Sequence, residues 1–252
     1  MNLWDASEIL IIGHRGFMAK YPENTILSFL KAVEMGAHGV ELDVWLTKDG
    51  LPVVIHDESL ERLCGLKKSV KEMKGEDLLH CSIGGEKIPI LEDVFHSLPD
   101  KCLINVEIKD VDAADAILKV IKENNAEERV LISSFNVDAL EKVRKRNPRI
   151  PLGLLVKDTN IIPKIPGLAS SLSLFSINLP IDAIEIFNLE EYLQVLHWIK
   201  GMGLKIALWP GKDEVYYRNN NLAKLKGLFD IVITDDVERM TKYLLGDTFK
   251  KF

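Results

Sequence analysis

Eight short apolar runs divide this chain, and segments with a helical pattern separate most of them. The runs are rich in Val, Ile and Leu with little polar alternation, which is typical of strands buried on both faces of a parallel sheet. They cover residues 9–13, 39–46, 103–109, 130–135, 152–156, 174–179, 205–209 and 230–234. Eight such units within 252 residues predict an α/β fold, a (β/α)8 TIM barrel, rather than an open doubly wound sheet.

Helical patterns occupy segments between the runs, namely 25–35, 91–97, 111–124, 137–145, 189–202 and 237–245. Asn24 and Asn136 stand at expected N-cap positions, and Gly36 and Gly203 stand near expected helix ends. The stretch 13–16 after the first run, Gly-His-Arg-Gly, lacks the GxGxxG spacing of a dinucleotide-binding sheet. This difference removes the main argument for the doubly wound alternative.

Composition excludes several classes of protein. Hydrophobic residues make up 47% of the chain, too many for a disordered protein, and the net charge of −6 disfavours general nucleic-acid binding. The apolar stretch 9–12 is too short for a signal segment or a membrane span, so we expect no stable membrane anchoring. Cys64, Cys81 and Cys102 form no CxxC pair and predict structural thiols in a reduced, cytoplasmic protein. An oligomeric state is not readable from the sequence.

A ninth run, 51–56, follows the second after only four residues, which is too short for a parallel crossover. It therefore predicts an antiparallel hairpin that turns at Asp49-Gly50. With these two residues at the turn centre, Lys48 would face Leu51 and Asp43 would face His56. We expect 1–252 to form a single TIM-barrel domain in which 57–88 is a small cap or insertion.

Polar residues gather at the carboxyl ends of the runs, where TIM barrels carry their sites. Glu41 and Asp43 share one face of a strand, and Glu107 is expected nearby. Three converging carboxylates repel one another, and an oxygen-only set favours a hard cation, Mg²⁺ or Ca²⁺ with Mn²⁺ as a further candidate, over zinc. The other polar residues at this end, His14, Arg15, His56 and Lys109, add acid/base and anion-binding groups suited to phosphoryl chemistry.

Each of these residues also has a structural interpretation. Glu41 and Asp43 could form a salt-bridging strand end, and His56 alone could be a structural histidine. Asp235 and Asp236 favour capping of the following helix. What favours a functional site is that so many such residues stand at the same end of consecutive strands. Three aromatic residues, Phe17, Phe135 and Trp209, could form an apolar wall for substrate or pack at the rim.

Five segments in a fixed order carry a family resemblance: Gly13-His14-Arg15-Gly16, Pro22-Glu23-Asn24-Thr25, Glu41-Leu42-Asp43-Val44, Asp49-Gly50 through His56-Asp57, and Val106-Glu107-Ile108-Lys109. Together they resemble the glycerophosphodiester phosphodiesterase family, within the phosphatidylinositol-phospholipase-C-like phosphodiesterases. The resemblance covers nearly the whole chain, since 89–95, 133–135 and 233–235 follow in the expected order. The specificity comes from the ensemble rather than from any single segment.

The resemblance implies a metal-dependent TIM-barrel hydrolase that converts small-molecule glycerophosphodiesters, such as glycerophosphocholine or glycerophosphoethanolamine, to an alcohol and glycerol phosphate. It implies Glu41, Asp43 and Glu107 as metal ligands. The remaining implied residues are His14 and His56 as the general acid/base pair and Arg15 and Lys109 as phosphate-binding cations. The nucleophile in this family can be the substrate's own glycerol hydroxyl, which gives a cyclic phosphate. We take His14 as base and His56 as acid, although the sequence does not assign the two roles.

One departure concerns substrate preference. Family members often follow the strand-seven Trp with Thr and an aliphatic-Asn pair, whereas Trp209 is followed here by Pro-Gly-Lys-Asp. Two alternatives to a small-substrate phosphodiesterase are a lysophospholipase D and a non-catalytic phosphate-binding barrel. The first predicts an exposed apolar patch around 57–88, but that segment is polar. The second predicts the loss of a site residue, but all are present.

Overall fold

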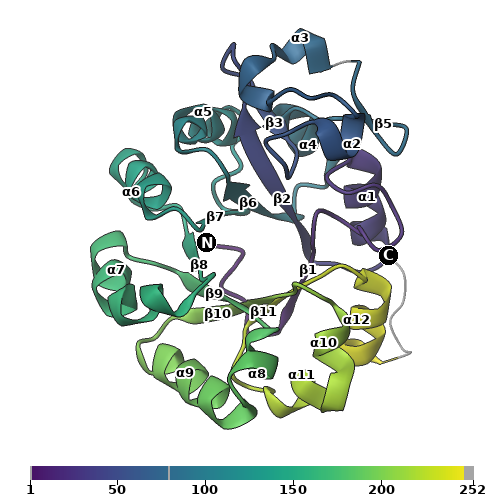
Figure 1. The fold of residues 1–252 in the computed structure, drawn as a ribbon. Helices are drawn as coiled ribbons and strands as arrows, with labels where there is room; N and C mark the ends of the chain where they lie inside the picture. Colours follow the sequence, from purple (N-terminus) through teal and green to yellow (C-terminus); the bar gives the residue numbers. More distant parts are fainter. Residues whose placement is uncertain (1, 79, 247–252) are drawn as a thin grey trace.

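The computed structural model describes residues 2–78 and 80–246. Parallel strands pair in the order β1-β11-β10-β9-β8-β7-β6-β2, and β1 also pairs with β2, so the strands close a barrel with helices outside it (Figure 1). The eight strands are β1 (Leu10–Gly13), β2 (Gly39–Leu46), β6 (Leu103–Ile108), β7 (Val130–Ser134), β8 (Leu152–Leu155), β9 (Ser176–Pro180), β10 (Lys205–Trp209) and β11 (Ile231–Thr234). The predicted (β/α)8 barrel is confirmed.

The helices that cover the barrel are α1 (Ile26–Glu34), α4 (Leu91–Ser97), α5 (Ala114–Glu123), α6 (Val137–Arg146), α7 (Ile165–Leu172), α8 (Ala183–Ile186), α9 (Leu189–Gly201), α10 (Glu214–Tyr217), α11 (Asn221–Lys224) and α12 (Val237–Leu245). Short 3-10 helices lie at Val70–Glu72, Val111–Ala113, Thr159–Lys164 and Arg218–Asn220. Asn136 caps α6 as predicted. At α1 the cap is Thr25, whose hydroxyl accepts a hydrogen bond from the Ser28 N–H at 3.2 Å, so the prediction of Asn24 as this cap is wrong.

Successive side chains along each strand point alternately outward, toward the helices, and inward, into the barrel. In β6, Ile104 and Val106 pack outward against the helices, whereas Leu103 belongs to a separate apolar cluster. The residues of that cluster, which lies within the barrel, are Trp4, Leu10, Ile12, Leu103, Leu131, Ala207, Ile231 and Ile233. The residues that share the inward face of Leu103 further along β6 are Asn105 and Glu107. The barrel interior therefore changes from apolar to polar toward the carboxyl ends of its strands.

The predicted hairpin forms, but with a different register. β3 (Pro52–Val54) pairs antiparallel with β2 outside the closed ring, with Val44 opposite Val54. The Ile55 N–H donates to the Asp43 carbonyl at 3.0 Å, so the predicted pairings of Asp43 with His56 and of Lys48 with Leu51 are wrong by one residue. The physical reason is a longer loop: the Thr47 N–H bonds the Leu51 carbonyl at 3.0 Å. Gly50 completes this three-residue loop with a φ of 82°.

Residues 57–88 cover the hairpin with short elements, α2 (Glu61–Cys64), α3 (Gly75–Leu78), β4 (Ser82–Ile83) and β5 (Glu86–Lys87). Their side chains and those of the hairpin share one apolar cluster, whose buried members are Val53, Ile55, Leu60, Val70, Met73, Leu78, Cys81 and Ile83. We refer to 57–88 as the cap. Its division from the barrel within a single domain stays a prediction.

Cys64 and Cys81 are joined by a disulfide within the cap, whereas Cys102 is a free, buried thiol. The prediction of three reduced cysteines is therefore wrong for two of them, because the cap brings together two residues 17 positions apart in sequence. Disulfides persist mainly in oxidising compartments, so one ground for the predicted cytoplasmic location is removed. That location stays a prediction. Within the part of the chain that the structure describes, no helix has both the length and the apolar character to cross a membrane.

Gly39 offers a test of how tightly the barrel closes. A Cβ at this position would lie 2.2 Å from the Leu103 carbonyl oxygen of the neighbouring strand, so Gly39→Ala must push β2 from β6. We expect this change to lower the free energy of unfolding by about 2 kcal/mol or more, measured by chemical denaturation. Gly201→Ala is the matched control, because nothing lies within 4 Å of its added Cβ. Equal denaturation midpoints for the two variants would contradict the close packing.

Candidate active site

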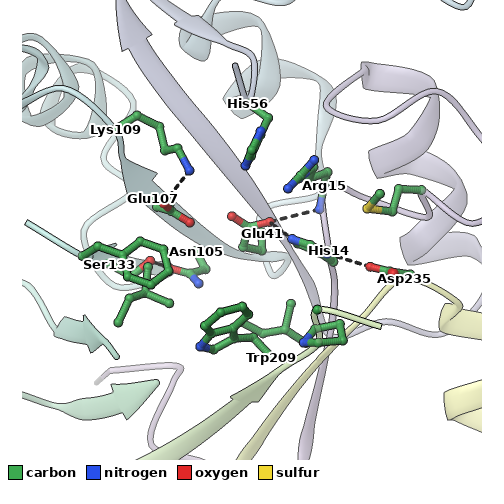
Figure 2. A pocket seen from close by; sticks show the side chains of 16 residues that line it. His14, Arg15, Glu41, His56, Asn105, Glu107, Lys109, Ser133, Trp209 and Asp235 are labelled. Atoms are coloured by element: carbon green, nitrogen blue, oxygen red, sulfur yellow. Dashed lines mark hydrogen bonds and ion pairs between the residues drawn. The ribbon is translucent and has the colours of Figure 1, made fainter. Parts of the chain in front are cut away.

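A cavity of about 400 Å³ opens at the carboxyl ends of the strands. Its lining includes eight of the predicted residues. Seven of them are labelled in Figure 2, where their side chains point toward a common space: His14, Arg15, Glu41, His56, Glu107, Lys109 and Trp209. The eighth is Phe135. Asp43 lies beside the cavity with 1% of its surface exposed. The structure therefore brings together residues from strands that are far apart in sequence.

Three carboxylates form the centre of the site. Glu41 and Asp43 come from β2, and Glu107 lies directly opposite Asp43 on β6. One oxygen of each carboxylate lies within 4.8 Å of one oxygen of the others, and all three residues are at least 91% buried. Such a set of oxygen ligands has the composition that hard divalent cations prefer.

Burial and mutual repulsion make the carboxylates unequal. Burial, with the Asp43 charge nearby, raises the pKa of Glu41 to about 8 and that of Glu107 to about 7. Burial also acts on Asp43, but Lys109 and Arg15 outweigh it and lower its pKa to about 2. Glu41 Oε1 is buried without a hydrogen-bond partner. A cation bound here would satisfy this oxygen and stabilise the ionised forms of all three groups.

Arg15 and Lys109 contact these carboxylates as well as the cavity. Lys109 Nζ lies 2.8 Å from Glu107 Oε1 and 3.3 Å from Asp43 Oδ1, and Arg15 Nε lies 3.3 Å from Asp43 Oδ2. Arg15 has a left-handed backbone, with a φ of 47°, and its N–H donates to Glu41 Oε2 at 3.0 Å. A strained backbone of this kind is typical of functional sites. Two cations thus partly offset three buried carboxylates.

Both histidines are oriented by a neighbouring carboxylate. His14 Nδ1 lies 2.6 Å from Asp235 Oδ1, and His56 Nδ1 lies 2.6 Å from Asp57 Oδ1. Burial lowers the pKa of His14, but the hydrogen bond to Asp235 and the charge of Glu41 raise it above its usual range. Burial lowers the pKa of His56 below its usual range, despite the charge of Asp43. The chain leaves β3 before His56, so the imidazole lines the cavity despite the shifted register.

One arginine of the cap connects the two sides of this site. Arg62 on α2 donates to both carboxylate oxygens of Glu23, at 2.8 and 2.9 Å, and to Asp57 at 2.5 Å. Glu23 in turn accepts a hydrogen bond from Arg15 at 3.0 Å, and Asp57 contacts His56. The cap therefore fixes the orientation of a cationic residue and of a histidine in the cavity.

The sequence interpretation missed three contributors to the site. Asn24, fully buried and with a φ of 56°, donates from Nδ2 to Asp43 Oδ2 at 2.9 Å. Asp235 orients His14 rather than capping a helix, whereas Asp236 caps α12 as predicted. Asn105 lines the cavity and accepts a hydrogen bond from the Ser133 hydroxyl at 2.9 Å. The sequence did contain a signal for Asn105, because it stands two residues before Glu107 and so shares the inward face of β6.

The apolar wall forms from two of the three predicted aromatic residues. Phe135 and Trp209 line the cavity and meet edge to face, with ring centroids 5.7 Å apart. Phe17 is 1% exposed and packs in the core against Tyr21, so of its two interpretations the structure favours packing over a substrate wall. Its neighbour Met18 lines the cavity instead.

Comparison with known proteins agrees with this geometry. The model of the glycerophosphoryl diester phosphodiesterase family matches residues 14–239. The chain belongs to this family. It is accordingly an enzyme, a phosphoric diester hydrolase.

Individual relatives match over almost their whole length. A glycerophosphodiester phosphodiesterase of Caldanaerobacter subterraneus subsp. tengcongensis is 37% identical over 92% of this chain and 96% of its own. A crystal structure of a glycerophosphodiester phosphodiesterase from Thermotoga maritima superimposes with a TM-score of 0.80 and 36% identity, over 94% of this chain and 99% of its own. A phosphodiesterase from Oleispira antarctica, at 24% identity and a TM-score of 0.79 over 92% and 95% of the two chains, shares the fold.

A further carboxyl group, that of the half-buried Asp213, contacts the backbone of Asp235. Its Oδ1 accepts hydrogen bonds from the Thr234 hydroxyl at 2.8 Å and from the Asp235 N–H at 3.0 Å, whereas its Oδ2 is buried without a partner. Burial raises the pKa of Asp213 from 3.8 to about 6. Ionisation of Asp213 therefore costs more free energy in the folded state than in the unfolded chain.

Replacing Asp213 by Asn should stabilise the protein in a pH-dependent way. Because the folded-state pKa lies above the unfolded value, the contribution of Asp213 is favourable below about pH 4 and is lost as the pH rises through about 6. Asn keeps an acceptor at Oδ1 without the charge. We expect Asp213→Asn to gain about 1–3 kcal/mol in free energy of unfolding at pH 7 but little at pH 4, measured by urea denaturation. The exposed Asp100→Asn is the control, and a pH-independent gain at Asp213 would contradict this account.

Proposed function

We propose that this hydrolase acts on small glycerophosphodiesters, such as glycerophosphocholine and glycerophosphoethanolamine, and releases an alcohol and glycerol phosphate. The observation that carries the proposal is one cavity that is lined by Glu41 and Glu107, two cationic side chains and two carboxylate-oriented histidines, with the third buried carboxylate, Asp43, directly beside it. Membership of the family supports this reaction class. The cavity is small and its lining mixes charged with apolar groups, which suits a compact phosphodiester with a polar alcohol.

Glu41, Asp43 and Glu107 would hold a divalent cation, Mg²⁺ or Ca²⁺ with Mn²⁺ as a further candidate. Their buried oxygens, the unpartnered Glu41 Oε1 and the raised pKa values of Glu41 and Glu107 all fit such an ion. When bound, the ion polarises a phosphoryl oxygen and offsets charge on the phosphate. Arg15 and Lys109, which also line the cavity, would donate hydrogen bonds to the nonbridging oxygens.

The histidines would move the protons. His14 would accept a proton from the attacking hydroxyl, either water or the glycerol hydroxyl of the substrate, as the new P–O bond forms. Attack by the glycerol hydroxyl would give a cyclic phosphate, and water would then have to open one of its P–O bonds to yield glycerol phosphate. His56 would donate a proton to the leaving oxygen as the P–O bond to the alcohol breaks. Asp235 and Asp57 hold Nδ1 of each ring, which leaves Nε2 for the reaction.

The division of roles between the histidines is open to the reverse assignment. The raised pKa of His14 favours a proton donor, and the lowered pKa of His56 favours an acceptor. A bound cation would oppose the Glu41 charge that contributes to the shift at His14. The assignment of His14 as base and His56 as acid therefore stays a prediction, which kinetic measurements on variants can test.

The activity test is release of glycerol phosphate from glycerophosphocholine. We expect His14→Ala and His56→Ala each to lose about 10²–10⁴-fold in kcat, because each removes a proton-transfer group. His197→Ala, which changes an exposed histidine on α9, is the control and should retain full activity. Wild-type activity in either active-site variant would refute the mechanism.

A second substrate separates the acid from the base. A glycerophosphodiester with p-nitrophenol as its alcohol needs little protonation of the leaving group, so loss of the general acid costs less on it. We expect this substrate to restore much of the activity of His56→Ala but not that of His14→Ala. Restoration of His14→Ala alone would reverse the assignment.

Cation binding should release protons near neutral pH. Glu41 and Glu107, with pKa values raised to about 8 and about 7, are partly protonated at pH 7 and must ionise to bind an ion. Titration calorimetry with Mg²⁺ or Ca²⁺ in buffers of different ionisation enthalpy should show proton release at pH 7 and less at pH 9. Glu41→Gln should weaken binding and reduce the release, while the exposed Glu190→Gln should change neither. Cation binding without proton release at pH 7 would contradict the electrostatics of this site.

A further inference from the structure

A second depression lies beside the active-site cavity and shares one wall with it. It has a volume of about 570 Å³ and is lined by residues of β9, α8 and α9, by the segment that follows β8, and by Trp209 of β10. Trp209 lines both this groove and the catalytic cavity, and the groove residue Val156 directly follows Leu155 of the cavity. Trp209 is held in place by its Nε1, which donates to the Asn178 carbonyl at 3.1 Å. The two spaces are therefore neighbours across a fixed aromatic ring.

The surface of the groove is mainly hydrocarbon. Ile162, Leu179, Ala183 and Val195 contribute to it, and Ile186 and Phe187 of α8 and its C-cap stand at its edge. Ile186 is 77% exposed and Phe187 is 39% exposed, so both present apolar surface to solvent. Exposed apolar surface gathered in a concave site marks a binding surface more often than scattered apolar residues do.

The charges around the groove differ in sign from those in the catalytic cavity. One basic residue, Lys157, and three acidic residues, Asp158, Asp182 and Glu191, line the groove, so its formal charge is −2. A phosphate or another anionic group is therefore disfavoured here, and so is an anionic membrane surface. A neutral hydrocarbon chain fits both the lining and the charge.

We propose that this groove binds a single hydrocarbon chain of a phosphodiester substrate whose phosphate occupies the catalytic cavity. This proposal rests on the proposed phosphodiesterase function and adds a substrate class to it, phosphodiesters that carry one acyl or alkyl chain. The sequence predicted an apolar patch for such substrates around the cap, but the groove lies on the other side of the barrel, at α8 and α9 (Figure 1). The hydrolysed bond is the same P–O bond, and the chain only adds binding energy.

The test compares soluble substrates with and without a chain, all below their critical micelle concentrations. Glycerophosphocholine is the reference, 1-hexanoyl-glycerophosphocholine carries the chain on glycerol, and glycerophosphohexanol carries it on the alcohol. Each fully buried methylene is worth about fourfold in binding, so a partly buried six-carbon chain should raise kcat/KM at least tenfold in one of the two arms. The arm that responds shows which end of the substrate faces the groove.

A matched pair of surface variants locates the effect. Ile186→Ser combined with Phe187→Ser should bring the ratio of chain to reference kcat/KM close to one. Trp198→Ser, which removes a 40% exposed aromatic side chain of α9 outside the groove, should leave the ratio as in the wild type. An equal loss in both variants would overturn the proposal.

Two further outcomes would also overturn it. The first is an equal kcat/KM for all three monomeric substrates. The second is a preference for the chain only in micelles or vesicles, which would make this face a membrane contact instead. Binding of hexylphosphocholine against phosphocholine, measured by calorimetry, keeps the groove testable apart from turnover, because burial of a chain gives a negative heat-capacity change. Chain-dependent binding without hydrolysis of any substrate would refute the proposed function and not the groove.

Discussion

The burial of three carboxylates at the mouth of one barrel constrains the rest of this site. Glu41, Asp43 and Glu107 cannot all be ionised in so small a volume unless positive charge lies close to them. Arg15 and Lys109 supply part of it through contacts at 2.8–3.3 Å. These cations favour Asp43, so it stays ionised while Glu41 and Glu107 are left with raised pKa values. A divalent cation and an anionic substrate together would complete the charge balance of the cavity.

The cap helps to position two side chains of the cavity. Arg62 holds Glu23 and Asp57, which in turn hold Arg15 and His56. Pairs between exposed ions contribute little to folding stability, so the network matters more for orientation than for the free energy of unfolding. Arg62 lies on the short helix α2, whose last residue, Cys64, is joined to Cys81 by the disulfide. A polar segment that looked like a simple insertion thus determines how two residues of the cavity are presented.

Much of the fold and the candidate site could be predicted because the signals are local. Strand β2 and helices α4 and α12 begin and end at the predicted residues, since their apolar patterns depend only on neighbouring positions. Glu41, Glu107 and Lys109 could be placed at one end of the barrel because parallel strands present their carboxyl ends together. Partnerships were harder to predict. Asn24 is of a residue type that is common at helix N-caps, and it stands directly before a predicted helix. Only the close approach of β2 makes its amide a partner of Asp43.

The sequence by itself determined eight strand and helix units, the end of the barrel that carries polar groups, and the set of carboxylates and histidines there. Tertiary structure decided which of these groups touch. Asp235 reaches His14 across 221 positions, the hairpin register shifts by one residue, and Phe17 turns into the core. The apolar groove beside Trp209 likewise combines side chains from 156 to 209. The reason is physical: periodicity and propensity act between neighbours in the chain, whereas ion pairs, loop closures and cavities depend on distances that exist only after the barrel has closed.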